Sequence, residues 1–295
     1  MHERAATGSR HVKPGKARFD DIYDRPDPRA YFRTLRRLNY QIPHHAQRVF
    51  RALMEARRKT RSPEHSTTVL DLCCSYGINA ALLNYELTLD DLNTRYASPR
   101  MAGLTSSELA ALDRAFFAAR RRPRAARSVG VDLASNAVSY ALKVGLLDEG
   151  FAENLERAAP SPALQSAISS VDLVTVTGGI GYISERSFQR ILDCASEPPW
   201  VVAFVLRMVS YEPIAETLSR YGLVTEQLAS ETFLQRRFAN AEERLYALDE
   251  LERAGVDVSG KESGGYYHSQ LFVSRPAWDA AELSLESLLS RAITA

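Results

Sequence analysis

The sequence is poor in cysteine: its 295 residues contain only three, Cys73, Cys74 and Cys194. Their odd number and the absence of a Cys-x-x-Cys pair argue against a disulfide framework and against a structural zinc site. The six histidines are scattered along the chain and offer no spacing typical of metal ligands. We therefore expect no bound metal and a reducing, cytoplasmic compartment.

The chain also lacks an excess of charge of one sign and any long apolar run. Lysine plus arginine number 37 and aspartate plus glutamate 36, which gives a formal charge of +1, so no global field directs the protein to nucleic acid or to an anionic membrane. No stretch approaches the roughly 20 apolar residues of a membrane span, and the polar, basic N-terminus does not resemble a signal peptide. We expect partners other than nucleic acid or membrane.

The sequence does contain the material for a large core, because 45% of its residues are hydrophobic and 9% aromatic. Residues 1–18 have no hydrophobic periodicity, which predicts a disordered tail. Residues 19–66 carry helical stripes on both sides of Pro43, the first formed by Tyr31, Leu35 and Leu38, and predict an N-terminal helical lid. The remaining residues, 67–295, are predicted to form a Rossmann-like domain.

Short apolar runs alternate with helix-spaced segments in this domain. The runs at 69–72, 128–133, 171–178 and 199–209 are typical of buried parallel strands, and residues 136–147 and 185–194 between them of helices. The alternation predicts a doubly wound α/β sheet. Residues 87–127 are expected to form a helical insertion. The late segments TFLQRRF and GYYHSQLFVSRP are expected to be antiparallel strands that complete one edge of the sheet.

The segment VLDLCCSYG, residues 69–77, predicts a strand, a tight turn and the start of a helix. Asp71 lies near the strand end, Gly77 opens the helix, and the small residues before it allow close approach of a ligand to the backbone. Asp132 ends the next predicted strand, where a carboxylate suits the two hydroxyls of a ribose. From the residues alone, the turn is equally compatible with an ordinary connection, and Asp132 with a helix cap.

Taken together, these strands resemble those of class I S-adenosylmethionine-dependent methyltransferases over residues 69–209. VLDLCCSYG is similar to their first motif, GVDLASNAVSYA to their ribose-binding acidic motif, and VDLVTVTGGIGYIS to the loop after their fourth strand. Cys73 and Ser75 stand where the family pattern has glycines. A dinucleotide oxidoreductase is the rival cofactor interpretation, but it requires a tighter Gly-x-Gly-x-x-Gly.

The resemblance implies that S-adenosylmethionine binds at the strand ends, as substrate or methyl donor. The binding residues that we expect are Asp71, Cys73, Ser75, Tyr76, Gly77, Asp132, Leu133, Thr177, Gly178, Gly179, Tyr31 and Arg207. Arg207 would clamp a carboxylate through its planar fork, or else form an ion pair at the strand end. Aromatic walls suit a sulfonium, so Phe32, Tyr76 and Tyr182 are also expected near the site.

The longer pattern resembles a bacterial subfamily that includes azetidine-2-carboxylate synthases, in which the α-amine of S-adenosylmethionine attacks its own Cγ and releases methylthioadenosine. This resemblance implies catalytic roles for Tyr182, Asn136 and Ser210. The residues alone also allow purely structural roles: a packed aromatic ring for Tyr182, an exposed helix residue for Asn136 and a helix cap for Ser210. Four residues of the late strands are expected either to reach the rim of the binding pocket or only to form part of the sheet edge: Gln235, Arg236, Arg237 and His268.

Intramolecular cyclisation is therefore our leading expectation. Methyl transfer to a small-molecule acceptor is the alternative; the loop after the fourth strand lacks the Asn-Pro-Pro-Tyr type of motif, which makes nucleic-acid bases poor candidate acceptors. A third hypothesis is a catalytically silent cofactor-binding scaffold that engages a protein partner. The sequence leaves the possibility of a homodimer open.

Overall fold

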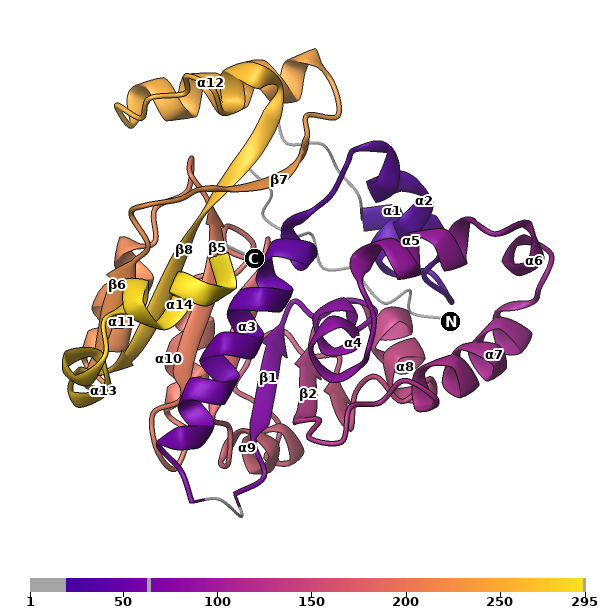
Figure 1. Cartoon of the computed structure of the whole chain (residues 1–295), viewed down its shortest axis with the longest axis horizontal. Helices are drawn as coiled ribbons and strands as arrows, with labels where there is room; N and C mark the ends of the chain where they lie inside the picture. The colour runs from indigo at the N-terminus through magenta and orange to yellow at the C-terminus, as the bar shows by residue number, and fades with distance from the viewer. Residues whose placement is uncertain (1–19, 63–64, 294–295) are drawn as a thin grey trace, which may run out of the picture.

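The computed structural model describes residues 20–62 and 65–293, so the tail predicted for residues 1–18 lies outside the described residues. A mixed sheet in the order β3-β2-β1-β4-β5-β8-β6 forms its centre, and β7 pairs with β8 (Figure 1). The strands are β1 (Thr68–Leu72), β2 (Arg127–Val131), β3 (Glu149–Phe151), β4 (Leu173–Thr177), β5 (Trp200–Leu206), β6 (Leu223–Gln227), β7 (Phe233–Arg237) and β8 (Tyr266–Pro276).

The strands β3, β2, β1, β4 and β5 are parallel, and β8 joins them antiparallel to β5. This is the strand order of the class I methyltransferase fold, and it confirms the doubly wound sheet with an antiparallel C-terminal edge. All residues of β1 and β5 are buried, as expected of strands that are covered on both faces. The short strands β3 and β6 were not expected from the sequence.

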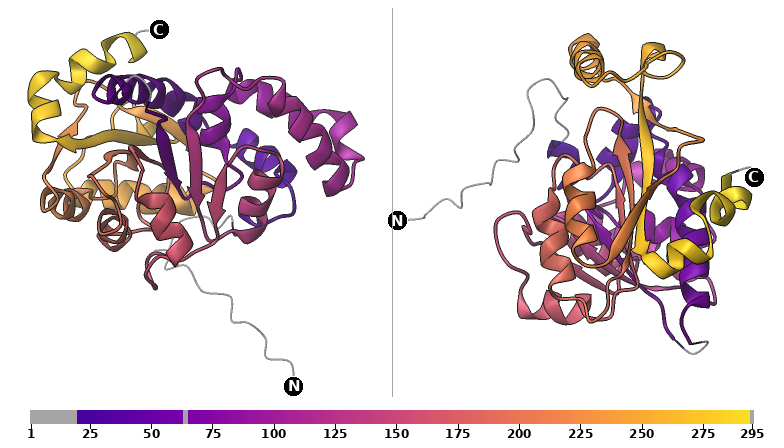
Figure 2. Two further views of the ribbon diagram at one scale, coloured as in Figure 1. Left: turned by 90° about the horizontal axis from the view of Figure 1, so that it is seen from below. Right: turned by 90° about the vertical axis from the view of Figure 1, so that its left-hand side faces the viewer.

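Helices cover both faces of the sheet (Figure 2). The helices are α1 (Asp20–Tyr23), α2 (Arg29–Arg37), α3 (Ile42–Lys59), α4 (Ile78–Asn84), α5 (Leu89–Ala97), α6 (Pro99–Ala102), α7 (Ser106–Ala118), α8 (Ser135–Lys143), α9 (Pro162–Ile168), α10 (Glu185–Leu192), α11 (Glu212–Ser219), α12 (Ala241–Arg253), α13 (Ala277–Glu282) and α14 (Leu285–Ile293). One core cluster joins the sheet to α9, α10 and α11, and another joins the opposite face to α3 and α14. Within the described residues, no helix is long and apolar enough to cross a membrane.

The segment expected to form the lid contains α1, α2 and α3. Since α3 packs on the sheet beside α14, the name lid is kept below for residues 20–43. The helical pattern breaks before Pro43 and not at it, because proline occupies the first turn of α3, where no backbone N–H donor is needed. On α2, Tyr31, Phe32 and Leu35 face inward and are buried. They pack with α4, α5 and α8 in one core cluster.

The expected insertion between β1 and β2 contains α5, α6 and α7. Capping boxes begin α5 and α7, with Thr88 and Thr105 as the N-cap residues. Asp27, just before α2, accepts hydrogen bonds from Arg29 and from Ser106 of α7. These bonds attach the lid to the insertion.

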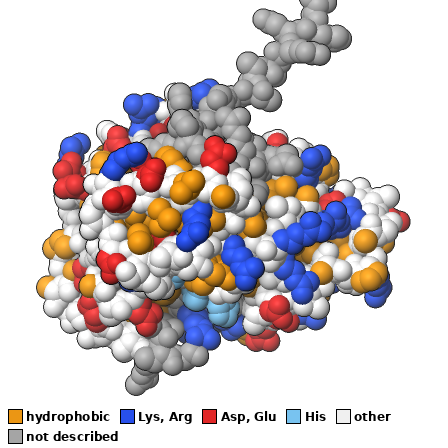
Figure 3. Space-filling model, turned by 90° about the horizontal axis from the view of Figure 1, so that it is seen from above, with side chains coloured by type: hydrophobic (Ala, Val, Ile, Leu, Met, Phe, Trp, Pro, Cys, Tyr) orange, Lys and Arg blue, Asp and Glu red, His pale blue; other side chains and the backbone are white. Residues whose placement is uncertain are grey.

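The segment from β7 to the start of β8 forms a projection beyond the sheet. The upper part of β8 pairs with β7, and α12 stands beyond the end of the sheet (Figure 1). Viewed from above, this end of the molecule shows acidic, basic and apolar side chains interspersed (Figure 3). The projection matters for the site because β7 brings Gln235 and Arg236 to the lid.

Candidate functional site

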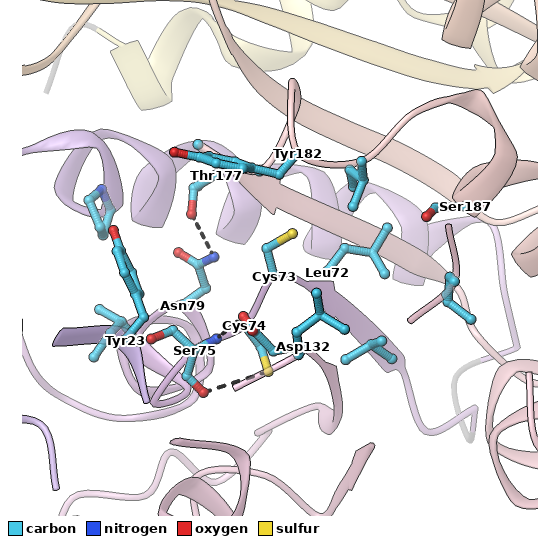
Figure 4. Close-up of a pocket in the computed structure, with 18 of the residues that line it drawn as sticks. Tyr23, Leu72, Cys73, Cys74, Ser75, Asn79, Asp132, Thr177, Tyr182 and Ser187 are labelled. Carbon is cyan, nitrogen blue, oxygen red and sulfur yellow. Dashed lines mark hydrogen bonds between the residues drawn. The ribbon is translucent and has the colours of Figure 1, made fainter. Parts of the chain in front are cut away.

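A cavity of about 250 Å³ lies beyond the carboxyl ends of β1, β2 and β4 (Figure 4). Ligand pockets typically have about 300–1,000 Å³, so this cavity is near the small end of that range and suits a single ligand of nucleoside size. Its lining residues are Tyr23, Tyr31, Leu35, Tyr40, Pro43, Leu72, Cys73, Cys74, Ser75, Ile78, Asn79, Val131, Asp132, Leu133, Glu153, Asn154, Leu155, Glu156, Arg157, Thr177, Gly178, Gly179, Tyr182, Ile183, Ser187, Gln235 and Arg236.

The turn between β1 and α4 has a left-handed backbone at every second residue. The φ angles are 58° at Cys73, 48° at Ser75 and 75° at Gly77. Glycine adopts this conformation freely, whereas another residue loses roughly 1–2 kcal/mol there. Cys73 and Ser75 thus have a strained backbone at positions where glycine would be unstrained. Backbone strain of this kind clusters at functional sites.

Close packing surrounds this turn. A Cβ atom on Gly179 would stand 2.8 Å from Sγ of Cys73, and one on Gly77 would meet Ala141 and Leu146 at 3.2 Å. The first contact brings the loop after β4 against the turn after β1. Glycine at position 179 is therefore a steric requirement, whereas at position 77 it is favoured by the left-handed φ in addition to the tight packing.

Asp132 joins the turn to the end of β2. Its carboxylate accepts hydrogen bonds from the backbone N–H of Ser75 at 2.9 Å and of Ala134 at 2.9 Å. A carboxylate has about four lone-pair positions, so it can accept hydroxyl donors from a ligand in addition. Asp132 does not cap α8, because the N-cap residue of that helix is Ala134, and its bond to the Ala134 N–H closes a turn before the helix. This geometry is compatible with the expected ribose role.

Asp71 lies behind the cavity wall and is 3% exposed. Its Oδ1 accepts from Nδ2 of Asn79 at 2.9 Å and from the hydroxyl of Thr175 at 2.8 Å, and its Oδ2 has no partner among the described residues. Burial raises the pKa of Asp71 to about 7, although the two hydrogen bonds act to lower it. Asn79 also donates to Thr177 at 3.0 Å, so this carboxylate orients the amide in the wall.

The lid contributes tyrosines to the cavity. The ring of Tyr31 contacts those of Tyr23, at 5.6 Å between centroids, and Tyr40, at 6.5 Å. Tyr182 enters from the loop after β4, and its hydroxyl is directed to the same end of the cavity as that of Tyr23 (Figure 4). Burial raises the pKa of Tyr23 and of Tyr31 well above the ordinary value, so both hydroxyls are protonated at neutral pH.

The structure brings many of the predicted site residues together in the cavity lining. These are Tyr31, Cys73, Ser75, Asp132, Leu133, Thr177, Gly178, Gly179 and Tyr182. The others are absent from the lining: Asp71 lies behind it and Gly77 is packed below the turn, while Tyr76, Asn136, Arg207, Ser210 and the expected aromatic Phe32 have other contacts. Phe32 is stacked on Tyr96 at 4.5 Å.

Tyr76 and Asn136 hold the lid in place. The hydroxyl of Tyr76 accepts from the N–H of Arg25 at 2.9 Å and lies 3.1 Å from the carbonyl oxygens of Ile22 and Arg25. The N–H of Asn136 donates to the carboxylate of Asp24 at 2.7 Å. Because Tyr23 lies within this fastened segment, both residues position a cavity-lining side chain from outside the cavity.

Arg207 and Ser210 have structural partners. Arg207 pairs with Glu262 at 2.5 Å and donates to the carbonyl of Asp257 at 2.7 Å. The hydroxyl of Ser210 accepts from the N–H of Glu212 at 3.3 Å, at the start of α11. For Arg207, these contacts are the ion pair that the sequence left open. Ser210 does not cap α11, because the N-cap residue of that helix is Tyr211, and its hydroxyl instead closes a turn just before the helix.

Several lining residues were missed in the sequence. Tyr23 and Tyr40 have no distinguishing pattern, and Glu153 and Glu156 follow β3, which was itself not recognised. Asn79 could have been recognised from the sequence, since it is a polar residue in the first turn of the helix that follows the predicted ligand-binding turn. No group of three or more His, Cys, Asp or Glu side chains in residues 20–62 and 65–293 is placed to hold a metal ion.

Comparisons with known proteins concern the fold alone. No protein-family model and no curated protein sequence matches the chain. Among solved structures, it is similar to the plantazolicin methyltransferase BamL, with 12% identity and a TM-score of 0.43 over 83% of this chain and 89% of that one. It is also similar to magnesium protoporphyrin IX methyltransferase from Synechocystis PCC 6803, with 10% identity and a TM-score of 0.37 over 78% and 80% of the two chains. The [4+2]-cyclase SpnF has 12% identity and a TM-score of 0.36 over 76% and 80%.

Proposed function

We propose that the protein is an S-adenosylmethionine-dependent enzyme, and that its reaction is methyl transfer to a small-molecule acceptor. The observation that carries the proposal is the junction of the turn after β1 with the end of β2. There, left-handed backbone at Cys73, Ser75 and Gly77 forms an open turn whose Ser75 N–H is bound by Asp132. This pairing at the strand ends of a 3-2-1-4-5 sheet is suited to an adenosyl ligand.

The residues present fit such a ligand. Asp132 would accept the ribose hydroxyls, and Leu133, 43% exposed at the rim, would offer an apolar surface to the adenine. Ser75 has a buried hydroxyl without a partner among the described residues, which is a polar atom still available to a ligand. S-adenosylmethionine supplies an electrophilic carbon on a sulfonium, and the lid tyrosines can stabilise that cation by about 0.5–2 kcal/mol.

The lid limits which acceptors fit. Tyr23 and Tyr31 are protonated at neutral pH, because burial raises the pKa of each, so their hydroxyls donate hydrogen bonds and do not act as bases. An acceptor with a lone pair already available, such as a neutral amine, suits this lining. The residues of the lid would hold it in line and exclude water.

Cyclisation of S-adenosylmethionine to azetidine-2-carboxylate and methylthioadenosine is the second candidate. It is favoured by the size of the cavity, since about 250 Å³ leaves little room beside a nucleoside-sized ligand. The same tyrosine-lined volume would hold the aminocarboxypropyl chain folded for attack by its own amine. Tyr182 would then contact the folded chain, while Asn136 would act only through the lid.

Incubation of the purified protein with S-adenosylmethionine distinguishes these reactions. Methyl transfer predicts that S-adenosylhomocysteine forms only when a panel of small amines is added. It also predicts that the Asp132→Asn variant forms less S-adenosylhomocysteine than the native protein does. Methylthioadenosine formed without any acceptor would establish cyclisation. Tight binding without turnover in either assay would instead favour a silent scaffold with a protein partner, and Tyr182→Phe would then change nothing.

A further inference from the structure

The end of the cavity beside Gly178 carries a buried amide that the adenosyl ligand does not explain. Gln235 of β7 is 5% exposed and lines the cavity. Its Oε1 accepts a hydrogen bond at 2.6 Å from the hydroxyl of Ser269, which is fully buried. This bond fixes the orientation of the amide, so Nε2 is presented on the opposite side, and no hydrogen bond of Nε2 occurs within the described residues.

A second donor lies next to this amide. Nε2 of Gln235 is 3.3 Å, and the hydroxyl of Tyr40 3.7 Å, from the point where a Cβ of Gly178 would stand. The hydroxyls of Tyr40 and Tyr31 interact with each other. Burial raises the pKa of both tyrosines, and their hydrogen bond further raises the pKa of Tyr31 but acts to lower that of Tyr40, as expected when Tyr31 donates and Tyr40 accepts. The proton of the Tyr40 hydroxyl therefore remains for a ligand.

The surroundings keep this end of the cavity open and polar. Gly178 has a φ of 68°, and its lack of a side chain leaves the space between the two donors empty of Cβ. Arg236 follows Gln235 and also lines the cavity. Its guanidinium is held by Glu243 at 2.9 and 2.6 Å, so its charge is compensated and its position fixed.

We infer that Gln235 Nε2 and Tyr40 Oη form a donor pair that binds a carboxylate of a ligand in this cavity. An amide nitrogen only donates, which excludes an ammonium group as its partner, and the two oxygens of a carboxylate satisfy both donors at once. The ligand carboxylate has two candidate sources, and for the first of them the inference rests on the proposed function. The carboxylate belongs either to the amino-acid part of S-adenosylmethionine or to an acidic acceptor.

Two substitutions remove the donors with little change of shape. Gln235→Glu keeps the acceptor for Ser269 and replaces the donor by an oxygen that repels a carboxylate. Tyr40→Phe removes the other donor and keeps the ring. Gln165→Glu, which adds the same charge on an exposed residue of α9, is the matched control. Far-UV circular dichroism and thermal unfolding establish that each variant is folded.

Calorimetric titrations with three probes then identify the source. S-adenosylhomocysteine carries the carboxylate, methylthioadenosine is the same thioether without the amino-acid part, and benzoate is added to protein saturated with S-adenosylhomocysteine. If the ligand carboxylate is that of the nucleoside, Gln235→Glu weakens S-adenosylhomocysteine at least tenfold and methylthioadenosine less than twofold. If it belongs to the acceptor, both nucleosides bind unchanged and benzoate binding to the loaded protein is lost.

The donor pair is refuted if Gln235→Glu and Tyr40→Phe leave all three affinities within twofold of those of the native protein. A parallel loss for S-adenosylhomocysteine and methylthioadenosine would also overturn it, because that result points to damage of the whole cavity. Failure of the proposed function has a different signature: the native protein would then bind neither nucleoside. Benzoate titrated into the unloaded native protein and Gln235→Glu would still decide the donor pair.

Discussion

Asp71 gives the most quantitative prediction, because it is a buried carboxylate without a cationic partner in the described structure. Burial raises its pKa from 3.8 in the unfolded chain to about 7 in the folded protein. The folded protein therefore binds this proton more tightly than the unfolded chain does. Between these two pH values, the free energy of unfolding must fall as the pH rises.

The size of the effect follows from the two pKa values. One pKa unit corresponds to about 1.4 kcal/mol, so between pH 5 and pH 8 the contribution of Asp71 to the free energy of unfolding falls by about 2–3 kcal/mol. Asp71→Asn removes the titration, and its Oδ1 can still accept from Asn79 and Thr175. Relative to the native protein, the variant should gain about 2–3 kcal/mol between pH 5 and pH 8.

Urea unfolding at these two pH values measures that gain. The exposed Asp249→Asn on α12 is the control, since it removes an equal charge from a solvated position. Using the difference between variant and native protein cancels the titration of the other carboxylates. If Asp71→Asn and the native protein change equally between pH 5 and pH 8, Asp71 ionises normally and the account of its environment is wrong.

The turn and the lid provide two further predictions. Ser75→Gly should raise the free energy of unfolding by about 0.5–1 kcal/mol, because glycine accepts a φ of 48° without strain and the Ser75 hydroxyl has no partner among the described residues. Ser75→Ala keeps the Cβ and should give no such gain in urea unfolding; equal effects of the two would contradict the strain. Tyr76→Phe should destabilise by about 1–2 kcal/mol and increase hydrogen exchange at Arg25, whose N–H loses its acceptor. Unchanged exchange there would show that Tyr76 does not fasten the lid.

The centre of the fold could be predicted because its strands are apolar, buried and separated by helix-spaced segments. β3 escaped recognition because it has three residues, all half-buried, and one is glycine. β6 escaped because its burial is mixed and it lies at the sheet edge, so it lacks the continuous apolar run of β5. Local periodicity reports burial on both faces, and edge strands lack that signal.

The site was predictable only where it follows from strand ends. Carboxyl ends of adjacent parallel strands meet at one edge, so Asp132, Thr177 and the turn at Cys73 gather without further information. Tyr23 and Tyr40 reach the cavity through docking of the lid, which rests on contacts between residues far apart in sequence. Arg207 lies just beyond the end of β5, and its partner Glu262 arrives from a segment that carried no recognisable signal.

Isothermal titration of the native protein with S-adenosylhomocysteine tests the central claim most directly. The account predicts saturable binding of one nucleoside per chain, weakened about 10- to 100-fold by Asp132→Asn, since the loss of a charged acceptor for two ribose hydroxyls corresponds to roughly 1.5–3 kcal/mol. An absence of binding heat at several temperatures, or an affinity that Asp132→Asn leaves unchanged, would contradict the assignment of this cavity to an adenosyl ligand.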